Sequence, residues 1–321
     1  TTVVNEGAII VTRTTAGVTA TATLTPTTLT VDFAGATPKL GTVFKFFPGA
    51  TQAGVTVTLT NIGGGVTGTY NHSASALSIG TTPETTGLQN WYDATVDGTL
   101  YSALTGGTVL SVDGATVMRW EDISGNAGHL GAHASVASVR PTLKVGAVNG
   151  RRAIRFDGGD LLYSNALSIS TATNVPNSLF IYLVARHNSL TQGGSTPKRR
   201  FIILDGSGTS NTVTMGSTTT TMTVELGGNY ANTVNRPIDL NTFLVGVGFS
   251  NSTTGQWFIN GVQQPAPVIG IGADTYVTRS LQIGNQGLNG DICEILIYET
   301  LPTQAQRQAI ETYLRNKWAI Y

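Results

Sequence analysis

The sequence predicts an all-β protein, in which a small N-terminal β domain is followed by a jelly-roll sandwich with one C-terminal helix. Three observations lead to this fold class. Apolar and polar residues alternate in many short segments, which is the pattern of half-buried strands. Turn residues separate these segments at short intervals, as they do in sandwiches and jelly rolls. One segment near the end repeats apolar residues every four positions, as an amphipathic helix does.

The first 80 residues predict the small domain, with about five or six strands. Residues 18–25 alternate small or apolar residues with threonine, Pro26 interrupts the pattern, and residues 29–33 resume it. Further strands are expected at residues 43–47 and 54–60. Disorder is the alternative for a segment so rich in threonine and glycine, but bulky Val, Phe and Ile are too frequent for it.

A linker is predicted at residues 81–87 from composition, and the sandwich is predicted for residues 88–321. Asn149-Gly150 and Asn260-Gly261 are dipeptides typical of two-residue hairpin turns. Strands of the sandwich are expected at residues 179–185, 201–204, 221–226, 242–249, 256–259, 279–283 and 292–298.

The C-terminal helix has a clear start. Thr303 and Gln306 have the spacing of a capping box directly after Pro302. Ile310, Leu314 and Trp318 then place one apolar stripe along the helix, and we expect that stripe to lie on the sandwich.

The composition excludes several classes of protein. Charged residues make up 11% of the chain and the formal net charge is zero, so the clustered Lys and Arg of a nucleic-acid-binding surface are missing. No apolar run approaches the roughly 20 residues of a spanning helix, so no membrane insertion is expected. Cys293 is the single cysteine and is expected to be buried. No signal peptide is visible, and the lack of disulfides favours folding in a reducing cytoplasm.

Several motifs, taken in chain order, resemble the laminin-G-like, concanavalin A-like jelly-roll family found in bacterial surface proteins and tailed-phage virion proteins. The resemblance covers residues 88–321. It rests on residues 91–94, Trp120, Asp122, Ser124, Gly125, Asn126, Arg140, Pro141, the two Asn-Gly turns, residues 156–158, and the strand at 290–298 with its helix. This family hosts sugar binding, sugar cleavage and architectural roles, so the fold does not settle the function.

Glycan hydrolysis requires two carboxylates that face each other across a cleft. The spacing that concanavalin-type glucanases use, Glu-x-Asp-x-x-Glu on one strand, does not occur here. Strand alternation places the nearest candidates, Asp291 and Glu294, on opposite faces unless a bulge intervenes. We therefore expect no enzyme activity and no catalytic residue.

Two candidate binding sites remain. Asp157, Asp160 and Asp291 are candidates for a calcium site in a Gly-rich loop, and the alternative is a tight turn whose carboxylates bond their own backbone; no other cofactor is expected. Asn229, Tyr230 and Asn232 are candidates for sugar binding, because an exposed aromatic ring can stack on a pyranose face beside amide groups. Trp257 is a further aromatic candidate.

The resemblance and the composition together lead to a hypothesis of function. We expect a structural virion surface protein of a tailed phage, assembled in the host cytoplasm, in which residues 1–80 dock on a lattice of major capsid or tail protein. A symmetric homo-oligomer, commonly a trimer, is expected, and the jelly roll is expected to bind cell-surface glycans. The alternatives are a bacterial cell-surface lectin or adhesin module and, third, a glycan-degrading enzyme.

Overall fold

The structure is a computed structural model of the 321-residue chain. It describes residues 2–5, 8–15, 18–25, 28–34, 43–46, 56–60, 68–71, 76–79, 83–167, 178–189, 199–205, 212–217, 221–226, 233–237, 243–250, 254–265, 279–284 and 287–321. Within these ranges the chain forms four β-sheets and one α-helix, and the predicted all-β class with one C-terminal helix is confirmed.

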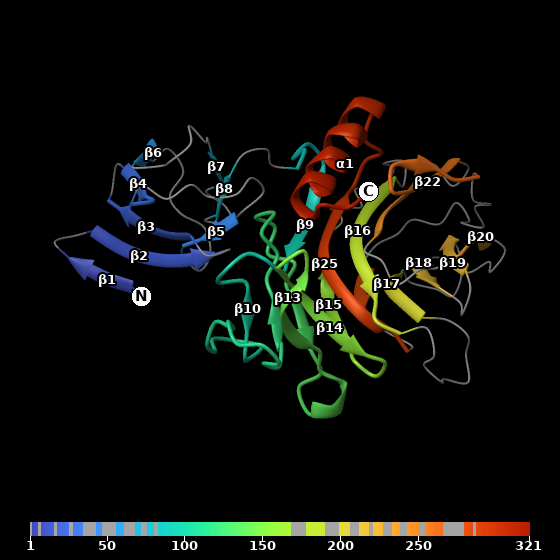
Figure 1. Ribbon diagram of the computed structural model, residues 1–321, viewed down its shortest axis with the longest axis horizontal. Helices are drawn as coiled ribbons and strands as arrows, with labels where there is room; N and C mark the ends of the chain where they lie inside the picture. Colours follow the sequence, from blue (N-terminus) through green and yellow to red (C-terminus); the bar gives the residue numbers. More distant parts are fainter. Residues whose placement is uncertain are drawn as a thin grey trace.

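The N-terminal residues form two small sheets, drawn in blue in Figure 1. The first has the order β1 (Thr2–Asn5), β2 (Ala8–Thr15), β3 (Val18–Leu24), β4 (Thr28–Asp32) and β6 (Thr56–Thr60). The second has the order β5 (Val43–Lys45), β8 (Ala76–Ile79) and β7 (Gly68–Asn71). The described residues therefore contain eight strands before residue 80, where the sequence predicted five or six.

A shared aromatic cluster joins these two sheets. Phe33 follows β4, and its ring lies edge-on to Phe44 of β5 at 5.6 Å between centroids. Phe44 in turn stacks on Phe46 at 6.0 Å. All three rings are fully buried beside alternating residues of β2, β3 and β4, namely Val11, Ala20, Ala22, Leu29 and Val31. The alternation in the threonine-rich strands thus builds a core of their own.

Two larger sheets form the sandwich. One has the order β13 (Thr142–Val148), β14 (Arg151–Asp157), β25 (Asn289–Tyr298), β16 (Leu179–His187), β21 (Phe243–Ser250), β22 (Thr254–Ile259) and β23 (Val262–Gln263), with β9 (Leu88–Asp93) also paired to β25. The other has the order β10 (Leu100–Tyr101), β11 (Arg119–Trp120), β12 (Leu130–Ala132), β15 (Leu162–Leu167), β24 (Arg279–Ile283), β17 (Arg199–Asp205), β18 (Thr212–Ser217), β19 (Thr221–Leu226) and β20 (Thr233–Pro237). A short 3-10 helix spans Ala137–Val139.

Each face of the eight-stranded sheet covers a separate core. Residues of β16 alternate between them, so that Leu183 packs between the two sheets and Tyr182 packs beneath the helix. The helix α1 (Gln304–Trp318) lies along the outer face over β9, β25 and β16 (Figure 1) and buries Ile310, Leu314 and Trp318 there, as the stripe predicted. In the described part of the chain, no helix has the length and apolar character that crossing a membrane requires.

The predicted turn and cap geometries are confirmed. Asn149-Gly150 and Asn260-Gly261 have positive φ at both residues (48° and 76°, 50° and 75°), as a type I′ hairpin turn requires. Thr303 accepts a hydrogen bond from the Gln306 backbone, and the Gln306 side chain accepts one from the Thr303 backbone. The start of α1 is therefore a complete capping box.

Asp122, one of the residues behind the family resemblance, holds the turn after β11 against β9. Its Oδ1 accepts the backbone N–H groups of Trp91 and Ser124, both at 2.9 Å. Its Oδ2 accepts hydrogen bonds from the Asn90 amide, the Ser124 hydroxyl and the Gly128 backbone at 2.9–3.1 Å. With five donors on a buried carboxylate, the motif has a structural role at this position.

The N-terminal sheets contact the sandwich through buried charges. The Lys45 ammonium of β5 donates to Glu121 next to β11, and both side chains are less than a tenth exposed. Arg13 of β2 donates to the backbone carbonyls of Lys45 and Phe46 at 3.0 and 3.2 Å, which fixes β5 beside β2. The division into domains at residues 80–88 stays a prediction, but the described end of the predicted linker is bonded to the sandwich: the Glu299 N–H donates to the Gly87 carbonyl at 2.9 Å.

Candidate functional site

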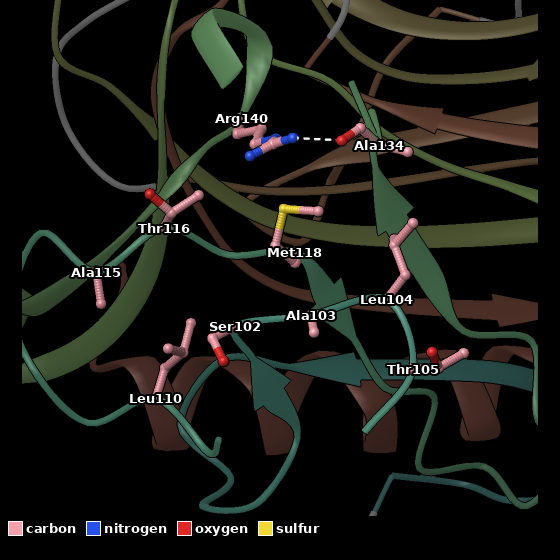
Figure 2. A pocket seen from close by; sticks show the side chains of 10 residues that line it. All are labelled: Ser102, Ala103, Leu104, Thr105, Leu110, Ala115, Thr116, Met118, Ala134 and Arg140. Atoms are coloured by element: carbon pink, nitrogen blue, oxygen red, sulfur yellow. Dashed lines mark hydrogen bonds between the residues drawn. The ribbon is translucent and has the colours of Figure 1, made fainter. Parts of the chain in front are cut away.

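The described surface contains a cavity of about 590 Å³ at the β10–β11 end of the nine-stranded sheet (Figure 2). Its walls come from three segments: the end of β10 with the loop after it, the stretch before β11, and the loop after β12. The lining residues are Ser102, Ala103, Leu104, Thr105, Leu110, Ala115, Thr116, Met118, Ala134 and Arg140.

Backbone hydrogen bonds fix the walls of this cavity. The Leu110 N–H donates to the Leu100 carbonyl at 2.9 Å, and the Met118 N–H donates to the Tyr101 carbonyl at 2.9 Å. The loop after β10 turns back at Gly107, where φ is +82° and an added Cβ would lie 2.8 Å from the Ala103 nitrogen. Only glycine fits this position without displacing the wall.

Arg140 is the cationic residue of the cavity wall. Pro141 favours extended backbone at the residue before it, and Arg140 has φ −112° and ψ 123°. Its Nε donates to the His133 carbonyl at 3.0 Å, and its Nη2 donates to the Ala134 carbonyl, the bond drawn in Figure 2. The two carbonyls hold the planar guanidinium in one orientation at the rim of the cavity.

A second arginine close to the cavity is already paired with a carboxylate. Arg119 donates to the Leu104 carbonyl at 2.7 Å and lies 4.0 Å from the centroid of the Tyr101 ring. Its Nη2 also lies 3.2 Å from Glu121 Oε1. Burial, with the charge of Glu121, raises the pKa of the Tyr101 hydroxyl above its ordinary value. Arg119 therefore supports the cavity wall through the Leu104 carbonyl, and its guanidinium forms an ion pair with Glu121.

Polar and apolar groups are mixed on the walls of the cavity. Leu104, Leu110 and Met118 supply apolar surface, while the hydroxyls of Thr105 and Thr116 form no hydrogen bond with any described residue. Ligand sites of this size, within the range of about 300–1,000 Å³, combine such apolar walls with a few polar groups that orient the ligand.

The carboxylates considered for catalysis lie elsewhere, and the bulge that was the stated exception to their opposite orientation is present. Val184 of β16 pairs with Glu294, and Ala185 pairs with Ile292, so Cys293 is the extra residue of a β-bulge in β25. Cys293 packs in the core beneath α1, whereas Ile292 packs between the sheets. Asp291 and Glu294 therefore share the outer face of the sheet.

Asp291 forms ion pairs with Arg155 and Arg186 on that face of the sheet. It accepts hydrogen bonds from Arg155 at 2.8 and 3.0 Å, from Asn188 at 3.0 Å, and from Arg186. Burial by itself would raise the pKa of Asp291, but the hydrogen bonds from Arg155, Asn188 and Arg186 outweigh burial and lower it. Asp291 is consequently an ionised carboxylate with its acceptor sites occupied.

Glu294 is enclosed beneath α1. Its Oε1 accepts hydrogen bonds from Trp91 Nε1 at 2.8 Å and Tyr313 OH at 2.9 Å, and its Oε2 accepts from Trp318 Nε1 at 2.6 Å and Lys317 Nζ at 2.9 Å. Burial and the neighbouring Asp93 raise the pKa of Glu294, although Lys317 opposes them. The cluster fixes the helix on the sheet and has no opening to solvent, since every one of these side chains is less than a tenth exposed.

The carboxylates of Asp157 and Asp160 bond the backbone of their own turn, and a calcium site there stays a prediction. Asp160 Oδ2 accepts the Asp157 N–H at 2.9 Å, and Asp157 Oδ1 accepts the Gly159 N–H at 3.3 Å. Burial raises the pKa of Asp160 to about 6. Asp291 is held by its arginines, and the described residues contain no cluster of three His, Cys, Asp or Glu side chains suited to a metal.

Of the sugar-binding candidates, the structure describes Trp257. Asn229, Tyr230 and Asn232 lie outside the described residues. Trp257, the other aromatic candidate, is 1% exposed, and its Nε1 donates to the Pro265 carbonyl at 3.0 Å, so the suggestion that it stacks on a sugar is wrong. Its ring fills the core between the sheets instead.

Sequence reasoning missed the cavity and the position of Arg140 in it. Arg140-Pro141 stood out only as part of the family resemblance, because a single arginine before a proline carries no chemistry of its own. The signal that could have found it is the concentration of Ser, Thr and Gly at residues 102–108, which predicts an irregular loop beside the strands.

Comparisons with known proteins identify the fold. No protein-family model and no curated protein sequence matches the chain. Among solved structures, a GH54 α-L-arabinofuranosidase soaked with a cyclic sulfate inhibitor matches with a TM-score of 0.51, and an arabinofuranosidase complexed with arabinofuranosyl-α-1,2-xylobiose matches with 0.53. Both are 12% identical to this chain and cover 72% of it. The botulinum neurotoxin serotype D binding domain matches with a TM-score of 0.49 at 9% identity, over 71% of this chain and 51% of that domain.

The chain spans 63% of the length of the arabinofuranosidases that it matches. At 12% identity the likeness shows the fold alone, an all-β sandwich of the jelly-roll type, and it confirms the architectural part of the resemblance. The expectation that the chain is not an enzyme is contradicted, because glycoside hydrolases are among the structures that share its fold. That expectation rested on the absence of carboxylates with the required spacing on one strand. A sandwich can also bring catalytic groups together from different strands and loops.

Proposed function

We propose that this protein is a carbohydrate-binding β-sandwich and that the cavity between Ser102 and Arg140 is its saccharide site. The observation that carries the proposal is the cavity itself, about 590 Å³ in volume, with an anchored guanidinium, several hydroxyls and apolar side chains on its walls. Saccharides present hydroxyls and C–H faces together, so they complement walls of mixed character. An arabinofuranosidase that shares the fold is complexed with arabinofuranosyl-α-1,2-xylobiose, which supports the same class of ligand.

A glycan array followed by titration calorimetry tests this proposal. Thr116→Trp places a large ring in the cavity and should abolish binding of any glycan that the unaltered protein retains. The control is Thr312→Trp, which changes an exposed threonine on α1, over the other sheet. Release of free sugar is followed in the same samples, because hydrolases share the fold. Binding that survives Thr116→Trp unchanged would exclude this cavity as the site.

We further propose that the molecule acts at the surface of a tailed-phage virion, with the N-terminal sheets docked on a capsid or tail protein lattice and the molecule assembled there as an oligomer. The family resemblance of residues 88–321 motivates this proposal, and the N-terminal sheets bury an aromatic core of their own, so they would serve as the docking part of the chain. Mass spectrometry of DNA-filled particles pelleted from nuclease-treated lysate should find this chain in fixed ratio to a shell or tail protein. Recovery with cell envelopes instead would favour the bacterial adhesin.

A further inference from the structure

The guanidinium of Arg140 retains hydrogen-bond donors for a ligand. An arginine side chain has five N–H donors. The His133 and Ala134 carbonyls accept one each, from Nε and Nη2. The remaining donors, both on Nη1 and one on Nη2, bond no described residue. One N–H of Nη1 and the remaining N–H of Nη2 lie side by side at the end of the guanidinium group. This geometry matches the two oxygens of a carboxylate.

The charge of Arg140 is also uncompensated within the described residues, in contrast to the charges of Arg119 and Arg155. Arg119 lies 3.2 Å from Glu121, and Arg155 lies 2.8 Å from Asp291. No carboxylate of the described chain lies within ion-pair distance of Arg140, and its two partners are neutral carbonyls. A fixed, unpaired cation at the wall of a cavity attracts an anionic group on the ligand.

We infer that the cavity selects a saccharide that carries a carboxylate, with the carboxylate bound end-on to Arg140. This inference rests on the proposed function and specifies its ligand class. The hydroxyls of Thr105 and Thr116 are then available to the sugar hydroxyls, and Leu104 and Met118 to its C–H face. Arginine suits this role better than lysine, because its planar fork matches both carboxylate oxygens.

The test uses the whole protein and uronic-acid oligosaccharides in two forms, the free acid and the methyl ester. The ester keeps the sugar and removes the charge. A panel of glucuronic, galacturonic, mannuronic and guluronic acid oligomers is titrated against the protein at low and high salt, beside neutral oligosaccharides of the same length. Two variants accompany it: Arg140→Gln, and the matched control Arg315→Gln, which removes the same charge from the exposed face of α1.

We expect at least one acid to bind roughly tenfold or more tightly than its methyl ester, as charged hydrogen bonds allow. That preference should weaken with salt, disappear in Arg140→Gln and persist in Arg315→Gln. Equal binding of acid and ester, or tighter binding of the ester, overturns the inference and leaves the proposed function standing. If no acid, ester or neutral glycan binds, the proposed function fails and the inference fails with it. The comparison of acid with ester needs no variant, so a poorly folded Arg140→Gln protein would not prevent a decision.

Discussion

Replacing Lys317 with methionine should destabilise the protein by roughly 3–5 kcal/mol, the usual consequence of removing one partner from a buried ion pair. The Lys317 side chain is fully buried, and its ammonium donates to Asp93 and lies 2.9 Å from Glu294 and from the Tyr313 hydroxyl. Methionine has a similar length and helix propensity, so the substitution removes the charge and largely preserves the packing. Two carboxylates would then share a buried site without a cation.

The loss should depend on pH with a definite sign. Burial and Asp93 already raise the pKa of Glu294, and removing Lys317 takes away the charge that opposes them. A carboxyl whose pKa is raised in the folded state contributes stability below its unfolded pKa and loses that stability as the pH rises through its folded pKa. Lys317→Met should therefore lose more stability at pH 7.5 than at pH 5.

Urea denaturation and thermal melts measure both effects. At about 2–3 °C per kcal/mol for a chain of this size, the melting temperature should fall by roughly 10 °C at neutral pH. Adding Glu294→Gln should recover part of the loss, because one of the two stranded carboxylates is removed. Arg315→Met is the control on the exposed face of the same helix and should change stability by less than about 0.5 kcal/mol. A loss below about 1 kcal/mol for Lys317→Met, typical of an exposed pair, would refute the buried cluster.

Three further predictions follow from other polar groups. Asp160→Asn should raise the melting temperature at pH 7.5 and change it little at pH 4. Burial raises the pKa of Asp160 to about 6, so its ionisation opposes folding increasingly as the pH rises from the ordinary carboxyl pKa to about 6, and fully above that; an equal benefit at both pH values would contradict this. Asp122→Ala should cost about 3 kcal/mol in urea denaturation, since five donors lose their acceptor, and a loss like that of a surface substitution would contradict the role of the motif. Lys45→Met should cost on the order of 2 kcal/mol, less than Lys317→Met, because Arg119 stays 3.2 Å from Glu121; calorimetry that finds the reverse order would count against this contact.

Local signals in the sequence predicted the local structure well. The capping box at Thr303 and Gln306 and the turns at Asn149 and Asn260 depend on residues within a few positions of one another, and all three form as predicted. The apolar stripe of the helix also identified its buried face correctly, because the period of an α-helix does not change along its length.

The orientation of Glu294 could not be predicted, because it depends on pairing between distant strands. The bulge at Cys293 arises where β25 meets β16, more than 100 positions earlier in the sequence, and it reverses the alternation from that point. The burial of Trp257 has the same origin, since its neighbours in the core come from other strands. The cavity at Arg140 depends on three separate segments, and the loop composition at residues 102–108 indicates only one of them.

The position of β25 in the middle of its sheet has a consequence for synthesis on the ribosome. β9, β14 and β16 all pair with β25, so the centre of the eight-stranded sheet is missing until residues 289–298 have been made. Pairings so distant in sequence form slowly, and the apolar face of β16 stays uncovered while it waits. The five-stranded N-terminal sheet, by contrast, has all its strands once residue 60 has emerged. During synthesis the N-terminal sheet can therefore form while the sandwich is still incomplete, and in that interval the uncovered apolar face of β16 favours association with other chains.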